Sequence, residues 1–297
     1  MNNTYPHLLV LLAVFIVAGS FIASNALMGT IDEFALNFLR FIIATLCLTP
    51  FVIFNKHYRQ QIKRTLTCAI VTSFFYSFYF VFLLIALRDT HVVNTSSLYT
   101  LTPVFTAILS IMMFKSTIST RQWLTYLIAI VGTLVVIFKG QISALISMTF
   151  NQGDAVYLLG VICMAGYTVS LKKLAPKVDT IVLTFTSLSF GSLWMGLVLL
   201  MSGQSIEISL LAQQDYLAIL YLAIPATLIT SFLFQTANVT LTPNQISAYG
   251  YLCPAFVVLI NFVIFNESAS SATFVGIAIS AIATWFLLSN KSITTSR

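Results

Sequence analysis

The chain has 297 residues, of which 59% are hydrophobic and only 7% are charged, and its formal net charge is +6. Soluble domains carry about 25% charged residues, so this composition excludes an ordinary soluble protein and predicts an integral membrane protein with the lipid bilayer as its surroundings. The basic excess is expected to reflect topology and contact with lipid surfaces. No patch of interleaved basic and aromatic residues is visible, and we predict no nucleic-acid partner.

Ten apolar runs are long enough to cross a bilayer, which takes about 20 residues of helix. They cover roughly residues 8–27, 34–54, 66–87, 92–114, 122–139, 154–172, 181–201, 214–236, 244–265 and 271–288. Runs of this length do not alternate with period two, and open sheets cannot satisfy their backbone in hydrocarbon. The sequence therefore predicts an all-α membrane fold with ten transmembrane helices.

The lysines and arginines between the runs indicate orientation. With the N-terminus inside, only Arg88 and Lys139 fall outside. The cytoplasmic set is Lys56, Arg59, Lys63, Arg64, Lys115, Arg121, Lys172, Lys173, Lys177, Lys291 and Arg297. The positive-inside rule then predicts two cytoplasmic termini in a protein of the plasma (inner) membrane.

The N-terminus lacks the positive region of a signal peptide, and the first run lacks a cleavage site, so we expect that run to remain as a span. The cysteines Cys47, Cys68, Cys163 and Cys253 stand singly, without metal-ligand spacing. We interpret them as small buried apolar residues. No disulfide, metal site or cofactor is expected.

A polar stretch near the middle divides the ten runs into five and five. We predict a first five-span repeat over residues 1–140, a connecting loop over 141–153 and a second repeat over 154–297. An odd number of spans in each half makes such a repeat inverted across the membrane. A shift of 151 residues lays Pro103 on Pro254 and Phe114 on Phe265, although sequence identity between the halves is low.

Several short motifs carry a resemblance to a known family. They are Leu-Thr-Pro-Val-Phe at 101–105, Leu-Cys-Pro-Ala-Phe at 252–256, Leu-Arg-Phe-Ile-Ile-Ala at 39–44, Ala-Gly-Ser at 18–20 and Phe-Asn-Glu at 265–267. With these motifs the chain resembles the EamA-like branch of the drug/metabolite transporter superfamily. The resemblance implies a ten-helix inverted-repeat carrier of small organic solutes that works by alternating access, with spans five and ten in scaffold or homodimer roles. One departure is Ser116, where the family usually has a glutamate that Glu267 keeps in the second half.

Arg40 is the one charged side chain well inside a run. A charge at that depth is costly and usually faces protein or water, so Arg40 is a candidate for binding the carboxylate or phosphate of a substrate. The alternative is that it extends outward or pairs with Asp32 or Glu33.

Polar and aromatic side chains within the runs are the other candidates for substrate contact. They are Tyr76, Tyr79, Asn94, Ser97, Tyr167, Gln235, Asn238, Gln245 and Tyr249. Asn94 and Gln245 occupy matched repeat positions, and we expect the two amides to approach the cavity from opposite sides. Taken singly, each of these groups is more often an interhelical hydrogen bond or an interfacial anchor.

Pro103 and Pro254 each remove a backbone donor, which frees the carbonyls of Tyr99 and Gly250 and loosens or kinks the helix. They are candidates for paired hinges, and a static kink is the alternative. No Asp or Glu lies near the middle of a run, so facilitated diffusion or solute exchange is favoured over proton antiport.

The leading hypothesis is a secondary carrier of a small organic solute such as an amino acid, without enzymatic activity. A membrane-embedded enzyme and a flippase of lipid-linked substrates are the alternatives. The enzyme is disfavoured because Asp32 and Glu33 are the only adjacent acidic residues.

Overall fold

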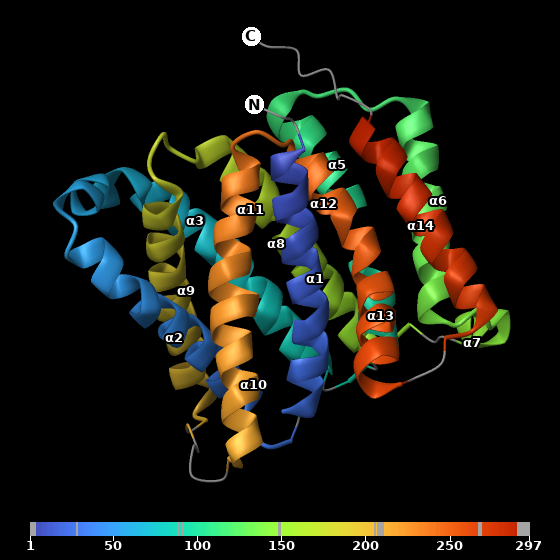
Figure 1. Cartoon of the computed structure of the whole chain (residues 1–297), viewed down its shortest axis with the longest axis horizontal. Helices are drawn as coiled ribbons and strands as arrows, with labels where there is room; N and C mark the ends of the chain where they lie inside the picture. The colour runs from blue at the N-terminus through green and yellow to red at the C-terminus, as the bar shows by residue number, and fades with distance from the viewer. Residues whose placement is uncertain are drawn as a thin grey trace.

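The computed structural model describes residues 4–27, 29–87, 89–90, 92–147, 150–204, 206, 211–266 and 269–289. Within these ranges the chain contains ten segments that are long and apolar enough to cross a membrane, and it has no strand. Figure 1 shows them packed in one bundle, most of them upright and the second and third inclined. The predicted fold class is confirmed: the chain is an all-α integral membrane protein.

The first half contains α1 (Tyr5–Ala26), α2 (Glu33–Ile53), α3 (Lys56–Leu87), α4 (Val92–Tyr99), α5 (Thr102–Phe114) and α6 (Thr120–Ile137). A short helix, α7 (Ile142–Ile146), lies in the connection. The second half contains α8 (Gln152–Leu174), α9 (Thr180–Ser202), α10 (Gln213–Ala223), η2 (Ile224–Ile229), α11 (Thr230–Asn238), α12 (Pro243–Ala248), η3 (Tyr249–Leu252), α13 (Cys253–Phe265) and α14 (Ser271–Ser289).

Two features differ from the sequence expectation. Helix α3 begins at Lys56, ten residues before the predicted apolar run, because Gln61 and Thr65 on its polar first turns are buried against other segments. The fourth, eighth and ninth spans are each broken: α4 is followed by α5, η2 is a π-helix between α10 and α11, and η3 is a 3₁₀ turn between α12 and α13.

The two halves repeat in the register that the prolines predict. Helices α5 and α13 have 13 residues each, and their first residues are 151 positions apart. Each follows a leucine of nearly identical geometry, Leu101 with φ −79° and ψ −12° and Leu252 with φ −86° and ψ −12°. Each ends at a left-handed residue, Lys115 with φ 52° and Asn266 with φ 54°. The breaks and the ends of the two helices are therefore equivalent features of the repeat.

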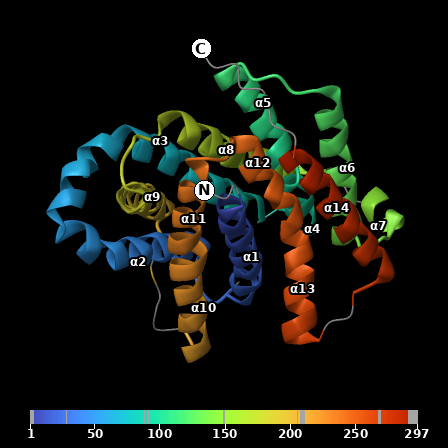
Figure 2. The same ribbon diagram turned by 45° about the horizontal axis from the view of Figure 1, so that its top comes forward.

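Helices of one half pack directly on helices of the other. Helix α2 packs along α9, where the hydroxyls of Thr45 and Ser192 are 3.1 Å apart. Helix α6 packs along α14, where the hydroxyls of Thr133 and Ser280 are 3.4 Å apart. Figures 1 and 2 show α6 and α14 side by side at one edge of the bundle. Because lipid is as apolar as leucine, such interfaces depend on close packing and interhelical hydrogen bonds.

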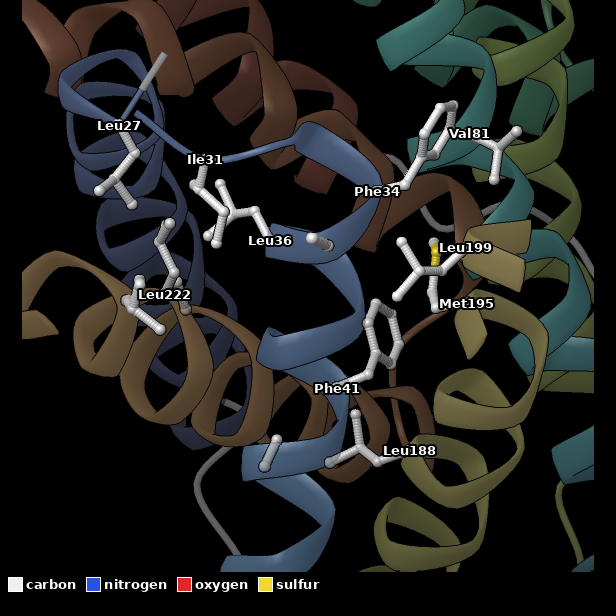
Figure 3. Close-up of a cluster of buried hydrophobic side chains, with 14 of the residues drawn as sticks. Leu27, Ile31, Phe34, Leu36, Phe41, Val81, Leu188, Met195, Leu199 and Leu222 are labelled. Atoms are coloured by element: carbon white, nitrogen blue, oxygen red, sulfur yellow. The ribbon is translucent and has the colours of Figure 1, made fainter. Parts of the chain in front are cut away.

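The largest buried cluster surrounds Phe41 on α2 (Figure 3). Leu188 and Met195 of α9 and Leu222 of α10 belong to the same cluster. The ring of Phe41 is 1% exposed, and a Cβ added to Gly191 would lie 2.5 Å from its Cδ1 atom. Because Gly191 has no side chain, the Phe41 ring can pack directly against α9. This packing fixes the position of α2, and with it that of Arg40 one residue away.

We predict that Gly276→Ala on α14 destabilises the α6–α14 interface. A Cβ at this position would lie 2.8 Å from the carbonyl oxygen of Gly132 and 2.9 Å from the backbone nitrogen of Val136. Overpacking costs about 1–3 kcal/mol, and each kcal/mol lowers the midpoint of thermal unfolding by about 2–4 °C in a protein of this size. The check is thermal unfolding of the purified protein in detergent. Ala278→Leu, on an exposed face of the same helix, is the control, and equal midpoints for both variants would contradict the prediction.

Candidate substrate site

Arg40 is buried inside the bundle, with 5% of its surface exposed. Its Nε donates to the Thr227 hydroxyl at 3.2 Å, and its Nη1 approaches the Asn37 side-chain oxygen at 3.4 Å. Its guanidinium carbon lies 4.9 Å from the centre of the Phe80 ring. Among the described residues no carboxylate is within salt-bridge distance of Arg40, and Asp32 is used as the cap of α2. The positive charge is thus held by neutral groups alone.

The residue that accepts the hydrogen bond from Arg40 Nε lies in an irregular turn of the eighth span. Thr227 lies in the π-helix η2, and its hydroxyl donates to the carbonyl of Leu222 at 2.7 Å, five residues back. The same oxygen accepts the hydrogen bond from Arg40. Pro225, which lacks a backbone donor, begins this irregular turn. Single π-helical turns occur often at functional sites, and this one presents a side-chain acceptor to a buried cation.

A line of polar side chains continues from Thr227 along one face of the eighth span. We call Thr227, Ser231, Gln235 and Asn238 the polar stripe; their spacing of three to four residues places them on one helix face. Each is at most 4% exposed. Ser231 forms a hydrogen bond with Tyr76. The Gln235 oxygen accepts a hydrogen bond from the Thr184 hydroxyl at 2.9 Å, and the Gln235 side chain also forms a hydrogen bond with Tyr167. The stripe therefore faces α2, α3, α8 and α9 in turn.

Two polar atoms of the stripe lack a hydrogen-bond partner within the described residues. They are the Nε2 of Gln235 and the Oδ1 of Asn238, a donor and an acceptor. A buried polar group without a partner costs about 1–3 kcal/mol. These two groups therefore have unused hydrogen-bonding capacity for a solute or a water molecule.

Aromatic rings from α3 and α8 lie beside the stripe. The rings of Tyr76 and Tyr167 lie 4.9 Å apart at an angle of 31°, and Tyr76 also contacts Phe41 at 5.7 Å and Phe80 at 5.3 Å. Tyr79 adjoins Phe80 at 5.0 Å. These rings and the stripe together offer a cation, amide groups, hydroxyls and apolar faces, which is a set of groups suited to a small organic molecule.

The two prolines lie where broken spans resume. Pro103 and Pro254 stand in the first turns of α5 and α13, where a missing backbone donor matters little. The carbonyl of Tyr99 accepts from the Thr102 hydroxyl at 2.7 Å, and the carbonyl of Gly250 accepts a backbone N–H at the start of α13. The expected loosening or kink thus takes the form of a break just before each proline, and both freed carbonyls are satisfied by neighbouring groups.

The two breaks meet inside the bundle. The ring of Tyr99 lies 4.0 Å from the position that a Cβ would take on Gly250. Between the breaks is a cavity of about 50 Å³ that is lined by Pro103, Tyr167 and Ser247, among others. This volume accommodates one or two water molecules, whereas sites for small organic molecules measure about 300–1,000 Å³. The breaks are closed on each other in this conformation.

A much larger hollow, about 870 Å³ in volume, opens at the Asn238 end of the stripe. It is lined by His57, Gln60, Gln61, Arg64, Lys172, Ala175, Pro176, Lys177, Val178, Asp179, Asn238 and Val239, from the start of α3, the α8–α9 connection and the end of α11. Asn238 belongs to both the hollow and the stripe. Gln235 lies about one helical turn from Asn238, and Thr227 with Arg40 about two turns further along the same span, away from the hollow.

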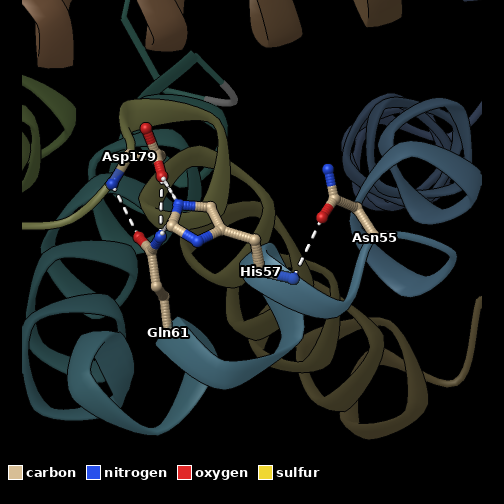
Figure 4. Close-up of polar contacts among 4 residues, drawn as sticks. All are labelled: Asn55, His57, Gln61 and Asp179. Carbon is tan, nitrogen blue, oxygen red and sulfur yellow. Dashed lines mark hydrogen bonds and ion pairs between the residues drawn. The ribbon is translucent and has the colours of Figure 1, made fainter.

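Hydrogen bonds among His57, Gln61 and Asp179 hold two segments together at one wall of the hollow (Figure 4). Gln61 donates to the Asp179 carboxylate at 2.6 Å and accepts from the Asp179 backbone at 2.8 Å. His57 lies 3.0 Å from the same carboxylate oxygen. These contacts tie α3 of the first half to the α8–α9 connection of the second. Residues of this wall were not predicted from the sequence.

The remaining predicted residues are distributed around the site. Tyr79, Ser97 and Tyr249 are buried, and the side chain of Asn94 lies outside the described residues. Tyr249 contacts His7 at 2.9 Å rather than the stripe. Gln245 caps α12 and donates to the Leu288 carbonyl at 3.3 Å. The expected approach of its amide to a central cavity is therefore not seen, because the start of α12 uses that amide.

Thr227 and Ser231 were missed at the sequence level. A usable signal was present, since Thr227, Ser231 and Gln235 repeat every four residues beside Pro225 within an apolar run. Hydroxyl residues in membrane helices often bond only to their own backbone, and several here do, including Thr230. The spacing marks this face of the span, but it does not show which hydroxyl bonds Arg40, because Arg40 comes from a different span.

Comparisons with known proteins agree with this architecture. The profile of the EamA-like transporter family matches residues 4–138 and again 151–289. An uncharacterized transporter of Archaeoglobus fulgidus is 26% identical over 275 residues, which cover 92% of this chain and 94% of that protein. The uncharacterized transporter YetK of Bacillus subtilis is 26% identical over 270 residues, covering 90% of this chain and 81% of that protein. A crystal structure with 15% identity aligns over 97% of this chain and 98% of that chain with a TM-score of 0.75, and it shows the same fold.

We predict that Arg40→Met leaves the protein as stable as the wild type, or makes it more stable. Replacing buried ion pairs with apolar side chains of similar size is often neutral or stabilising by about 1–4 kcal/mol, because the cost of desolvating the charges is removed. Arg40 has no ionic partner among the described residues, so its replacement removes that cost and leaves no opposite charge unpaired. Thermal unfolding in detergent checks this, with Leu39→Met on the same helix as the control. A fall of several degrees in the Arg40→Met midpoint alone would mean that Arg40 is retained for folding.

Proposed function

Because the chain belongs to the EamA-like transporter family, we propose that it is a secondary carrier that moves a small organic solute, such as an amino acid or related metabolite, across the plasma (inner) membrane. The solute binds along the polar stripe and passes through by alternating access. With both termini cytoplasmic, as the basic residues indicate, the hollow opens toward the cytoplasm. Family and relatives are transporters, and no catalytic role is assigned.

One observation supports this proposal most strongly: Arg40 is buried at the end of the stripe opposite the hollow, and its hydrogen-bond partners among the described residues are neutral. An unpaired charge in a membrane interior is expensive and tends to be retained for function. A carboxylate or phosphate on the solute would supply the missing counter-charge. Such charge-assisted hydrogen bonds are short and strong, so the proposed solute is an anion or a zwitterion.

The rest of the solute would contact the stripe and the aromatic side. Gln235 Nε2 and Asn238 Oδ1 are a free donor and a free acceptor among the described residues, and they would bind polar groups of the solute. Tyr76, Tyr79 and Tyr167 would contact its apolar or aromatic part. Asn94, Ser97, Gln245 and Tyr249, which are engaged elsewhere or not described, keep at most a role in another conformation.

The paired breaks supply the motion in this proposal. The cavity between them is too small for a solute at about 50 Å³, so transport requires the fourth and ninth spans to separate. Pro103 and Pro254 act as hinges, because each stands in the first turn of regular helix after a break, at an equivalent position of the repeat. Opening the breaks on one side and closing the hollow on the other would expose the stripe alternately.

The positions of the acidic residues favour solute exchange or facilitated diffusion over proton antiport. Asp154 and Asp215 are buried, but both lie in the first turn of a helix, where their carboxylates accept backbone N–H groups of Asn151 and Ala212. A proton-coupling carboxylate is expected deeper in the bundle and near the transported solute. Among the described residues the stripe has none.

The prediction is that an anionic or zwitterionic metabolite stabilises the wild type in a thermal screen against amino acids, nucleosides and organic anions. A ligand at 100 times its Kd stabilises by about 2.7 kcal/mol. The same ligand should bind Arg40→Met about 10- to 150-fold more weakly, because hydrogen bonds to a charged group contribute about 1.5–3 kcal/mol.

Leu39→Met is the matched control and should retain the wild-type response. Reconstituted wild-type protein should also exchange the stabilising solute across liposomes with saturation, while Arg40→Met should not. A folded Arg40→Met that responds like the wild type would contradict the role of Arg40. Binding without any flux would contradict the carrier itself.

A further inference from the structure

The hollow at the Asn238 end carries an excess of positive charge that the substrate site does not explain. Arg64, Lys172 and Lys177 line it, against the single carboxylate of Asp179. That carboxylate is already bound by Gln61 and by His57. No further anion within the described lining balances the three cations.

The three cations are not equivalent. The Lys172 ammonium donates to the carbonyls of Asn238 at 2.6 Å and Val239 at 3.3 Å. It therefore caps the C-terminal end of α11, where that helix lines the hollow. Arg64 and Lys177 are exposed to the hollow and form no ion pair among the described residues. They come from different halves of the molecule, one from α3 and the other from the α8–α9 connection. They face the same space and are available to a ligand.

We propose that Arg64 and Lys177 form a second anion-binding site, distinct from Arg40, which holds a carboxylate or phosphate group at the mouth of the stripe. As a step in transport, this inference rests on the proposed function: the site attracts the anionic solute into the hollow before it moves past Asn238 to Arg40. Arginine and lysine are the usual ligands of such groups, and a volume of about 870 Å³ is in the range of small-molecule sites.

Physical considerations favour a concentrating role. A recess lined by one sign of charge with low-dielectric walls raises the local concentration of counter-ions and speeds their association. The solvated location makes this attraction dependent on ionic strength, unlike the interaction at buried Arg40. The site should therefore be weak, general for anions and sensitive to salt.

Pyridoxal 5′-phosphate tests the site without knowledge of the natural solute, because its phosphate binds cationic sites and its aldehyde reacts with a nearby lysine. The full-length protein in phosphatidylcholine nanodiscs, which offer no anionic headgroup, is treated with the reagent and borohydride, and labelled lysines are mapped by mass spectrometry. We expect Lys177 to be labelled on the order of tenfold faster than the exposed Lys63. Inorganic phosphate should protect Lys177 and leave Lys63 unchanged.

Arg64→Gln should slow the labelling of Lys177 severalfold, whereas Arg59→Gln, which removes the same charge from an exposed position outside the hollow on the same helix, should leave it within about twofold. Equal labelling of Lys177 and Lys63, or no protection by phosphate, would overturn the proposal. These outcomes do not depend on flux. A labelled, protected Lys177 in a protein whose ligand response ignores Arg40 would refute the substrate site and leave the anion site standing.

Discussion

A backbone amide or carbonyl inside a bilayer has no water to bond to, yet three spans of this protein are interrupted within the part of the chain that the structure describes. At each interruption a particular donor satisfies a backbone carbonyl. The Thr102 hydroxyl donates to the carbonyl of Tyr99, a backbone N–H donates to that of Gly250, and the Thr227 hydroxyl donates to that of Leu222. The repair at Thr227 also supplies the acceptor for Arg40. The requirement to satisfy broken backbone thus determines where the polar interior of the bundle lies.

The polar interior connects the features of both halves. Arg40 lies at one end, beside tightly packed Phe41, and Asn238 lies at the other end, where the hollow begins. Between them the stripe meets rings from α3 and α8, and the two proline-bearing breaks close against each other nearby. The wall made by Gln61 and Asp179 joins the halves on the open side. A carrier that alternates between two open sides needs contacts of this kind, which join the halves and can be exchanged for others.

Much of the fold follows from the sequence, because helices in lipid must satisfy their own backbone and apolar runs of span length have few other conformations. The repeat was visible in Pro103 and Pro254, since proline acts locally on the helix that contains it. The site was harder to predict. Arg40 was found because a buried charge is rare, but its partner Thr227 is one hydroxyl among many and is selected by contacts from another span. Gln245 has the right chemistry, and the capping of α12 uses it.

In the proposed carrier, Arg40 is buried to receive the anionic group of a solute that enters along the polar stripe. A cryo-EM structure of the protein in nanodiscs, with a stabilising ligand from the metabolite screen, tests it most directly. We expect ligand density within hydrogen-bonding distance of the Arg40 guanidinium and the Gln235 amide, with the fourth and ninth spans moved apart. Density confined to the lipid face, with Arg40 still bonded only to Thr227 and Asn37, would contradict it.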